Sequence, residues 1–203
     1  MRIENIKLHN YRQFKELDIT FRRKSENDLH FLIGKNGTGK TNLLNAINWC
    51  LFGEETHLSE ISKPLPILNL NSINETEDGK DVEALVEIQL STGYNKYIEF
   101  ARRSVFRVYK SELQPMHQRD EFEARVVDDK GNSELLSEDD AISYVERFFP
   151  YKIKDYFFFD GERLDNYFRK TTSQNIKSAI FVISQVELLE NKMVPFLELA
   201  INH

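Results

Sequence analysis

A chain of 203 residues, 40% of them hydrophobic, is long enough to bury a sizeable core as one domain or slightly more. The net charge of -6 gives no general support to nucleic-acid binding, which would need a local basic surface. One cysteine excludes an internal disulfide, and no run approaches the ~20 apolar residues of a membrane span. Because the N-terminus is charged where a signal peptide is apolar, we expect a cytoplasmic protein with no membrane partner.

Alternating apolar residues at the start of the chain predict a β-hairpin. Residues 2–8 are expected to form an edge strand, and residues 17–21 its partner. The mostly apolar run 29–33 follows, and its length and composition are typical of a buried parallel strand.

The next eight residues, 34–41, read GKNGTGKT and meet every requirement of a phosphate-binding loop. Glycines at these positions let successive backbone N–H groups point at one anion. Lys40 would reach the outer phosphates of a nucleotide, and the Thr41 hydroxyl would bind Mg²⁺. Residues 42–52 are expected to form a helix that ends at Gly53 and directs its positive N-terminal end at the phosphates.

A polar segment and a second group of strands come after this helix. Residues 54–81 are expected to be a loop or small insertion on the surface. Three strands are then predicted near 82–90, 96–108 and 122–127, paired antiparallel. A further helix is expected to begin at Ser137, because acidic residues suit the first turn.

The aromatic stretch 156–159 predicts a short strand that leads into Asp160, with Glu162 close behind. Asp160 has three interpretations. It is a Mg²⁺-binding acid at the end of a core strand, a loop residue that senses nucleotide and couples two lobes, or part of a surface turn. Because the guanine-reading pattern Asn-Lys-x-Asp is absent, adenine is the expected base.

From residue 182 onward, apolar residues are spaced 4, 3, 4, 3 and 4 apart. This spacing is typical of a coiled-coil seam and equally of a packed helix. Because the pattern continues to the last residue, we expect residues 182–203 to be the start of a coiled-coil arm, and the chain to be part of a longer one.

Several cations in or beside the predicted strands are candidates for a DNA-facing patch, and the alternative is that they lie on a solvated strand face. They are Arg102, Arg103, Arg107 and Lys110, with Lys152 and Lys154 as weaker candidates.

Three segments together resemble the N-terminal half of an SMC-type ATPase head of the SbcC, RecF and RecN kind. They are NYRQF at 10–14, the phosphate loop, and NLLNAINWCLFG at 42–53. The stretch YFFFDGERL at 156–164 is similar to the DndD-like branch, which includes the SMC-like subunit of Lamassu anti-phage systems.

This resemblance implies an α/β fold: an ABC-type P-loop ATPase half-head (residues 1–181) with an antiparallel strand-rich block and the start of a coiled-coil helix. It implies ATP and Mg²⁺ as cofactors. The implied nucleotide contacts are Arg12, Asn36, Gly37, Thr38, Gly39, Lys40, Thr41 and Asn42. Thr41 and Asp160 would bind the metal, and Lys40, Asp160 and Glu162 would be catalytic. Asp160 stands where most such heads place a glutamine.

The resemblance also implies the partners: the C-terminal lobe of the same protein, a second identical head, DNA, and an effector subunit such as a nuclease. Head engagement driven by ATP would sense or grip DNA in anti-phage defence or DNA repair. The 203 residues alone would bind ATP without turnover. Two other functions stay open: a self-contained P-loop phosphotransferase with Asp160 as its Walker B acid, and a non-catalytic interaction module.

Overall fold

The computed structural model describes residues 2–21, 29–55, 67–91, 97–110, 112–117, 119–128, 130–151 and 154. The chain divides into two compact units, Met1–Val145 and Glu146–His203. The phosphate loop and every strand among the described residues belong to the first unit. Asp160, Glu162 and the expected coiled-coil start at 182–203 lie outside the described residues, so these predictions stay predictions.

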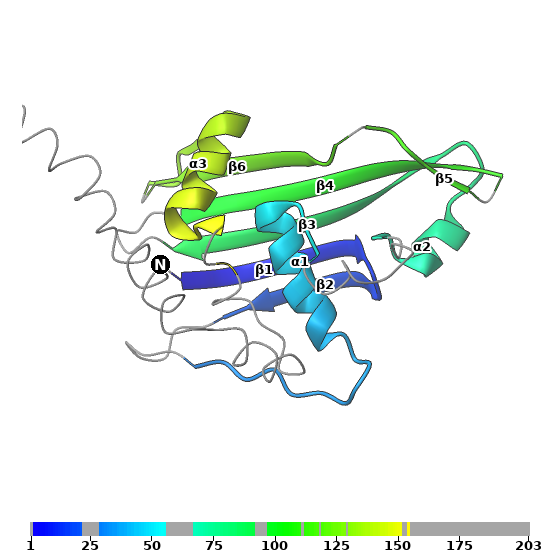
Figure 1. Ribbon diagram of the computed structural model, residues 1–203, viewed down its shortest axis with the longest axis horizontal. Helices are drawn as coiled ribbons and strands as arrows, with labels where there is room; N and C mark the ends of the chain where they lie inside the picture. Colours follow the sequence, from blue (N-terminus) through cyan, green and yellow to red (C-terminus); the bar gives the residue numbers. More distant parts are fainter. Residues whose placement is uncertain are drawn as a thin grey trace, which may run out of the picture. The chain divides into compact units, whose positions relative to one another are not determined.

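The first unit is built on one antiparallel sheet of seven strands, in the order β2-β1-β3-β4-β6-β7, with β5 paired to β4 beside this path (Figure 1). The strands are β1 Arg2–Tyr11, β2 Phe14–Thr20, β3 Asp81–Ser91, β4 Tyr97–Tyr109, β5 Glu112–Pro115, β6 Glu121–Val127 and β7 Ser133–Leu135. The expected hairpin and the antiparallel pairing of the later strands are confirmed. The expectation that the hairpin's first strand lies at an edge is wrong, because β1 pairs with β2 on one side and with β3 on the other. The short strands β5 and β7 were not predicted.

Alternation along the strands separates an apolar face from a charged one. In β3 every second side chain from Val82 to Leu90 is buried, while Glu83 and Glu87 point to the other face. The register places the buried residues of β1, β4 and β6 on the same apolar face as those of β3. The core of the unit lies on that face.

Helix α1 (Lys40–Phe52) covers the apolar face and contacts β3 and β4 (Figure 1). Its buried side includes Ala46, Trp49 and Cys50. The Cys50 thiol lies 3.4 Å from the carbonyl oxygen of Val86, and burial raises the pKa of Cys50 to about 12, which fits a packed thiol. As predicted, the helix ends at Gly53, whose N–H donates to the Trp49 carbonyl at 2.8 Å.

The expected buried strand at residues 29–33 is wrong for this structure. The segment forms no strand, and its apolar side chains are exposed, Phe31 at 76% and Ile33 at 95%. A parallel strand exists only when neighbouring strands satisfy its backbone groups, and no described strand pairs with this segment. Figure 1 shows it as a loop that leads into α1.

The surface loop expected at 54–81 is corrected in its described second half. Helix α2 (Leu70–Glu75) forms there, because the Asn69 side chain accepts hydrogen bonds from the N–H groups of Asn71 and Ser72 and caps it. Leu68 is buried and forms a β-bridge to Tyr11. This part of the segment therefore packs against the end of the β1–β2 hairpin.

Helix α3 (Glu138–Phe148) begins where its acidic residues predict. The Ser137 hydroxyl accepts from the backbone N–H of Asp140 at 3.2 Å and caps the helix. Ala141 and Val145 are buried. None of the helices in the described part of the chain is long and apolar enough to cross a membrane.

Candidate nucleotide site

The phosphate loop at 34–41 is an ordered turn that leads directly into α1. Gly37 and Gly39 adopt left-handed backbone angles, with φ of 81° and 100°, which residues with a side chain rarely adopt. The backbone N–H and hydroxyl of Thr38 both donate to the Lys35 carbonyl, the hydroxyl at 2.8 Å. The loop therefore has the shape in which backbone N–H groups can surround an anion.

Lys40 folds back over this loop. Its ammonium donates to the carbonyl oxygens of Gly34 at 2.8 Å and Lys35 at 2.9 Å. A lysine ammonium has three donors, so one stays available for a phosphate oxygen. These two bonds hold the charge at the mouth of the loop.

The N-terminus of α1 is also open to an anion. Gly39 occupies the N-cap position and supplies no side-chain hydrogen bond to the first turn. The first N–H groups of a helix have no partner within it, and they carry its positive dipole end. Thr41 lies in that first turn and is exposed, which suits the predicted Mg²⁺ contact. The described residues contain no cluster of three or more histidine, cysteine or acidic side chains that could hold a metal ion without a nucleotide.

The turn of the β1–β2 hairpin touches the loop where it enters the helix. The Asn42 amide donates to the side-chain oxygen of Gln13. A Cβ atom added at Gly39 would displace the ends of the Gln13 and Phe14 side chains, and the φ of 100° disfavours any residue with a side chain there, so glycine suits this close approach. Asn42 therefore binds the hairpin in this structure, and its predicted contact with a nucleotide stays a prediction.

Arg12, a residue of the β1–β2 hairpin that is also a predicted nucleotide contact, binds Glu55 in this structure. Its guanidinium forms a two-pronged ion pair with Glu55, with Nε at 3.0 Å from Oε1. The backbone of Arg12 has φ of 52° and is held by the chain at 67–69: its N–H donates to the Ile67 carbonyl, and its carbonyl accepts from the Asn69 amide at 2.8 Å. No hydrogen bond joins Arg12 to the described residues of the loop.

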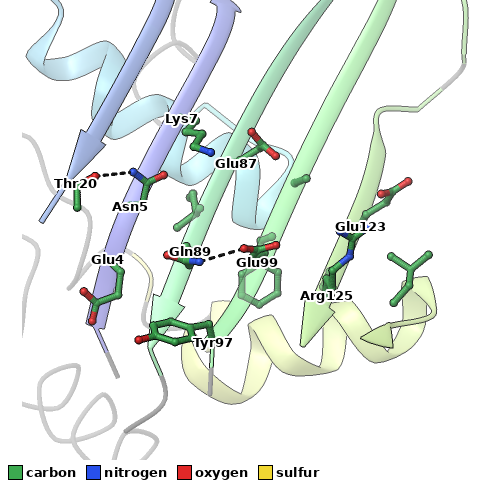
Figure 2. Close-up of a pocket in the computed structure, with 15 residues that line it drawn as sticks. Glu4, Asn5, Lys7, Thr20, Glu87, Gln89, Tyr97, Glu99, Glu123 and Arg125 are labelled. Atoms are coloured by element: carbon green, nitrogen blue, oxygen red, sulfur yellow. Dashed lines mark hydrogen bonds between the residues drawn. The ribbon is translucent and has the colours of Figure 1, made fainter. Parts of the chain in front are cut away.

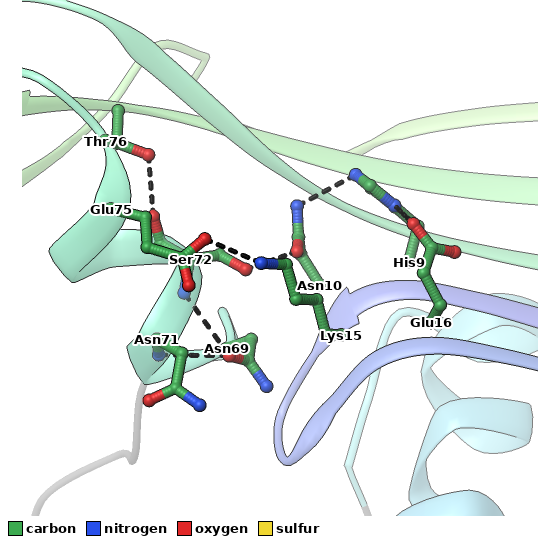
Figure 3. A network of polar contacts seen from close by, with 9 residues as sticks. All are labelled: His9, Asn10, Lys15, Glu16, Asn69, Asn71, Ser72, Glu75 and Thr76. Atoms are coloured by element: carbon green, nitrogen blue, oxygen red, sulfur yellow. Dashed lines mark hydrogen bonds and ion pairs between the residues drawn. The ribbon is translucent and has the colours of Figure 1, made fainter.

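A polar network ties the rest of the hairpin to α2 (Figure 3). The Ser72 hydroxyl donates to the Asn10 side chain, whose nitrogen lies 2.8 Å from Nε2 of His9. At the surface, Lys15 pairs with Glu75 at 2.6 Å. The hairpin turn is thus fixed by α2 on one side and by the loop and α1 on the other.

The candidate DNA patch is wrong as a single surface. Arg102 points to the apolar face, where its Nε donates to the Cys50 carbonyl at 3.0 Å and its guanidinium stacks 4.4 Å from the Phe122 ring. Burial lowers the pKa of this arginine. Because successive strand residues point in opposite directions, Arg103 lies on the opposite, charged face. There its guanidinium forms ion pairs with Glu83 and Glu121.

The two other cations of the candidate patch are engaged as well. Arg107 forms a two-pronged pair with Asp81, at 2.7 and 3.0 Å. Lys110 lies beyond the end of β4 with its ammonium 5.3 Å from the Tyr109 ring centroid. Of the weaker candidates, Lys152 lies outside the described residues, and Lys154 stacks on Tyr151 in the second unit.

The charged face of the sheet holds a groove of about 520 Å³, on the side away from α1 (Figure 2). Its charged lining consists of Glu4, Glu87, Glu99, Glu123, Lys7 and Arg125. Carboxylates outnumber cations there, so the groove does not suit a phosphate backbone.

Sequence reasoning missed three residues that shape the site: Gln13, Glu55 and Asn69. Gln13 stands inside the NYRQF stretch without an assigned role. Glu55 and Asn69 lie in the polar stretch after Gly53, where no spacing distinguishes them from surface residues. Their contacts depend on how the stretch folds back on the hairpin, which no local pattern encodes.

Comparison with known proteins gives one family. A family model described as AAA domain matches residues 5–197, nearly the whole chain. Among the curated relatives, a DNA double-strand break repair Rad50 ATPase of Pyrococcus abyssi is 26% identical over 75% of this chain and 15% of its own length. A Retron Vc95 probable ATPase of Vibrio cholerae is 26% identical over 72% of this chain and 31% of its own length.

A DNA replication and repair protein RecF of Clostridium kluyveri is 37% identical over 60 residues, 30% of this chain and 15% of its own. The chain thus spans less than a third of the length of these relatives. A solved chain from work on ATP-driven dimerization and DNA-stimulated activation of SMC ATPases aligns over 90% of this chain and 99% of that one, at 18% identity and a TM-score of 0.49.

Proposed function

The chain belongs to the AAA domain family, as the N-terminal lobe of an SMC-like P-loop ATPase, and from that premise we propose that it binds ATP with Mg²⁺ for a DNA-associated ATPase head. In this proposal, engagement of two identical heads by ATP senses or grips DNA. The engaged state controls an effector such as a nuclease, in anti-phage defence or DNA repair. The DndD-like branch stays part of the proposal.

The arrangement of Lys40 carries this proposal. The ammonium is held at the mouth of a loop that has two left-handed glycines, and the uncapped start of α1 lies directly behind it. Lysine charge, backbone N–H groups and the helix dipole therefore converge on one place, which is the electrostatic requirement for binding a polyphosphate. Thr41 supplies the Mg²⁺ ligand, and Asn36, Gly37 and Thr38 line the phosphates.

Hydrolysis needs groups that the described residues do not supply. Asp160 and Glu162 are proposed to bind Mg²⁺ and to orient water, and the second head to complete the site. Arg12 is proposed to contact a phosphate once nucleotide is bound. On this basis the 203 residues bind ATP but do not turn it over.

The exposed segment at 29–33 supports the C-terminal lobe as a partner. Five mostly apolar residues that precede a phosphate loop are exposed, and the backbone groups of an isolated strand are unsatisfied. Strands from the C-terminal lobe would pair with this segment and bury its side chains.

The proposed DNA contact is placed away from the sheet. Repair functions on DNA are named for the Rad50 and RecF relatives, which supports DNA as a partner here. On the charged face, however, Arg103 and Arg107 are paired with carboxylates, and glutamates outnumber cations in the lining of the groove. Nucleic acid would displace these pairs without gaining net attraction.

The test is calorimetric titration of Mg-ATP into the chain and its Lys40→Ala variant, with phosphate release followed in parallel. We expect binding without turnover in the wild type, and loss of binding in the variant because the phosphates lose their cation. Lys7→Ala, which removes an exposed lysine on the charged face, is the matched control and should leave binding unchanged. Binding that survives Lys40→Ala would contradict the proposal, and turnover by the chain alone would contradict the half-site.

A further inference from the structure

Arg12 and Glu55 form the most shielded ion pair among the described residues. Their side chains are 7% and 11% exposed, whereas the pairs on the charged face are far more open to water. Both guanidinium nitrogens that face Glu55 are hydrogen-bonded to its carboxylate. A pair so shielded is screened little by salt, and breaking it leaves a charge without compensation.

A third residue holds the carboxylate in place. The Tyr11 hydroxyl donates to Oε1 of Glu55, and its ring packs against Trp49 with 5.6 Å between centroids. Burial, together with the neighbouring Glu55 charge, raises the pKa of Tyr11, so the hydroxyl stays a donor. Glu55 therefore has a fixed position, directly after the helix that begins with Lys40.

The backbone of Arg12 is fixed equally well, next to the phosphate loop. Its N–H and carbonyl are both bound to the segment 67–69, and the following residue, Gln13, contacts Asn42 and Gly39. Consecutive Cα atoms are about 3.8 Å apart, so the long Arg12 side chain starts within reach of the loop. It is the side chain alone that is turned away, towards Glu55.

We propose that Glu55 is a positioning residue that stands in for a nucleotide phosphate on Arg12 while the site is empty. Nucleotide binding then exchanges the partner of Arg12, from the Glu55 carboxylate to a phosphate oxygen. Guanidinium groups bind carboxylate and phosphate with the same two-pronged geometry, so the exchange needs only rotation of the side chain. This inference rests on the proposed function, because it requires nucleotide at the loop.

The exchange makes a prediction about affinity that a purely structural role does not make. When a competing internal ligand occupies Arg12, the apparent dissociation constant rises in inverse proportion to the competent fraction. Glu55→Gln keeps the shape and removes the negative charge. It should therefore tighten Mg-ATP binding by about 10-fold, equivalent to ~1.4 kcal/mol, while lowering the melting temperature of the empty protein.

The experiment compares Mg-ATP dissociation constants of the wild type, Glu55→Gln, Arg12→Ala and the double variant. Arg12→Ala should weaken binding, and Glu55→Gln should bring no gain in the Arg12→Ala background, because the gain acts through Arg12. Glu121→Gln is the matched control: it breaks the Arg103 pair on the charged face and should leave affinity unchanged. Melting curves without nucleotide verify that each variant is folded.

If wild-type binding is normal and Lys40→Ala abolishes it, yet Glu55→Gln binds no more tightly, the exchange is wrong and the proposed function stands. If the wild type does not bind Mg-ATP, both fail together. If Glu55→Gln does not fold, the test is made on the wild type by NMR of the Arg12 Nε–H resonance. This resonance is assigned by its absence from the spectrum of Arg12→Lys. The exchange requires this resonance to move when Mg-ATP is added, and an unmoved resonance overturns it.

Discussion

The two faces of the sheet are made from the same strands and yet hold their arginines in opposite ways. Arg102 is turned inward against α1, where it bonds to the Cys50 carbonyl and covers the Phe122 ring. Arg103, its neighbour in the chain, is turned outward to Glu83 and Glu121 in the solvent. A guanidinium thus stabilises packing on one face, whereas on the other it forms ion pairs that are exposed to solvent and screened by salt. The residue type alone does not show which of these two roles an arginine has.

The largest difference between the faces should come from truncating an apolar side chain beneath α1. Phe100 is fully buried and stacks on Phe122 with 6.0 Å between ring centroids. Phe100→Ala removes these contacts and leaves a cavity, so the free energy of unfolding should fall by about 3–5 kcal/mol. Urea denaturation measures this loss. Glu99→Ala, one residue away on the charged face, should change it by less than about 1 kcal/mol, and equal losses would contradict the division into two faces.

A smaller difference should separate the two neighbouring arginines. Arg102→Ala leaves the Cys50 carbonyl without its donor and uncovers the Phe122 ring, so a loss of about 2 kcal/mol is expected. Arg103→Ala breaks only exposed ion pairs and should lower the free energy of unfolding by less than about 1 kcal/mol. Paired urea curves at low and high salt test this, because only the Arg103 effect should shrink with added salt.

The smallest effect concerns Asp81 and Arg107 at the edge of the charged face. The hydrogen bonds from Arg107 lower the pKa of Asp81 in the folded state. The pair therefore stabilises the fold above the unfolded pKa of about 3.9 and is lost as pH falls through the lower folded value. The melting temperatures of wild type and Asp81→Asn should differ slightly near neutral pH and converge in acid. A difference that grew on acidification would have the wrong sign.

Local patterns predicted the parts of the fold that depend on neighbouring residues in the chain. The alternation in β3 and the helix that follows the phosphate loop and ends at Gly53 are encoded within a few residues, and both are confirmed. The capped start of α3 belongs to the same class, because Ser137 and its acidic neighbours act on one helical turn.

Predictions that required a distant partner were wrong or missing. The strand expected at 29–33 lacks strand neighbours in the described part of the chain, and composition cannot show where such neighbours come from. The contact of Arg12 with Glu55, 43 residues further along the chain, was missed for the same reason, while the assignment of Arg12 to a nucleotide phosphate stays a prediction. Alternation along β4 already places Arg102 and Arg103 on opposite faces, but which of these faces is covered by α1 is known only once the strands and the helix are packed together.

The exposed segment at 29–33 has a practical consequence for handling the protein. A short run of exposed aliphatic and aromatic residues that pairs with no described strand has the features that drive edge-to-edge aggregation. Concentrated solutions of the 203 residues should therefore self-associate through this run, and a charged substitution at Ile33, the most exposed of its side chains, should keep them dispersed. The same substitution would place a charge where a partner strand would bury Ile33. A change at this residue that improves solubility would therefore weaken assembly.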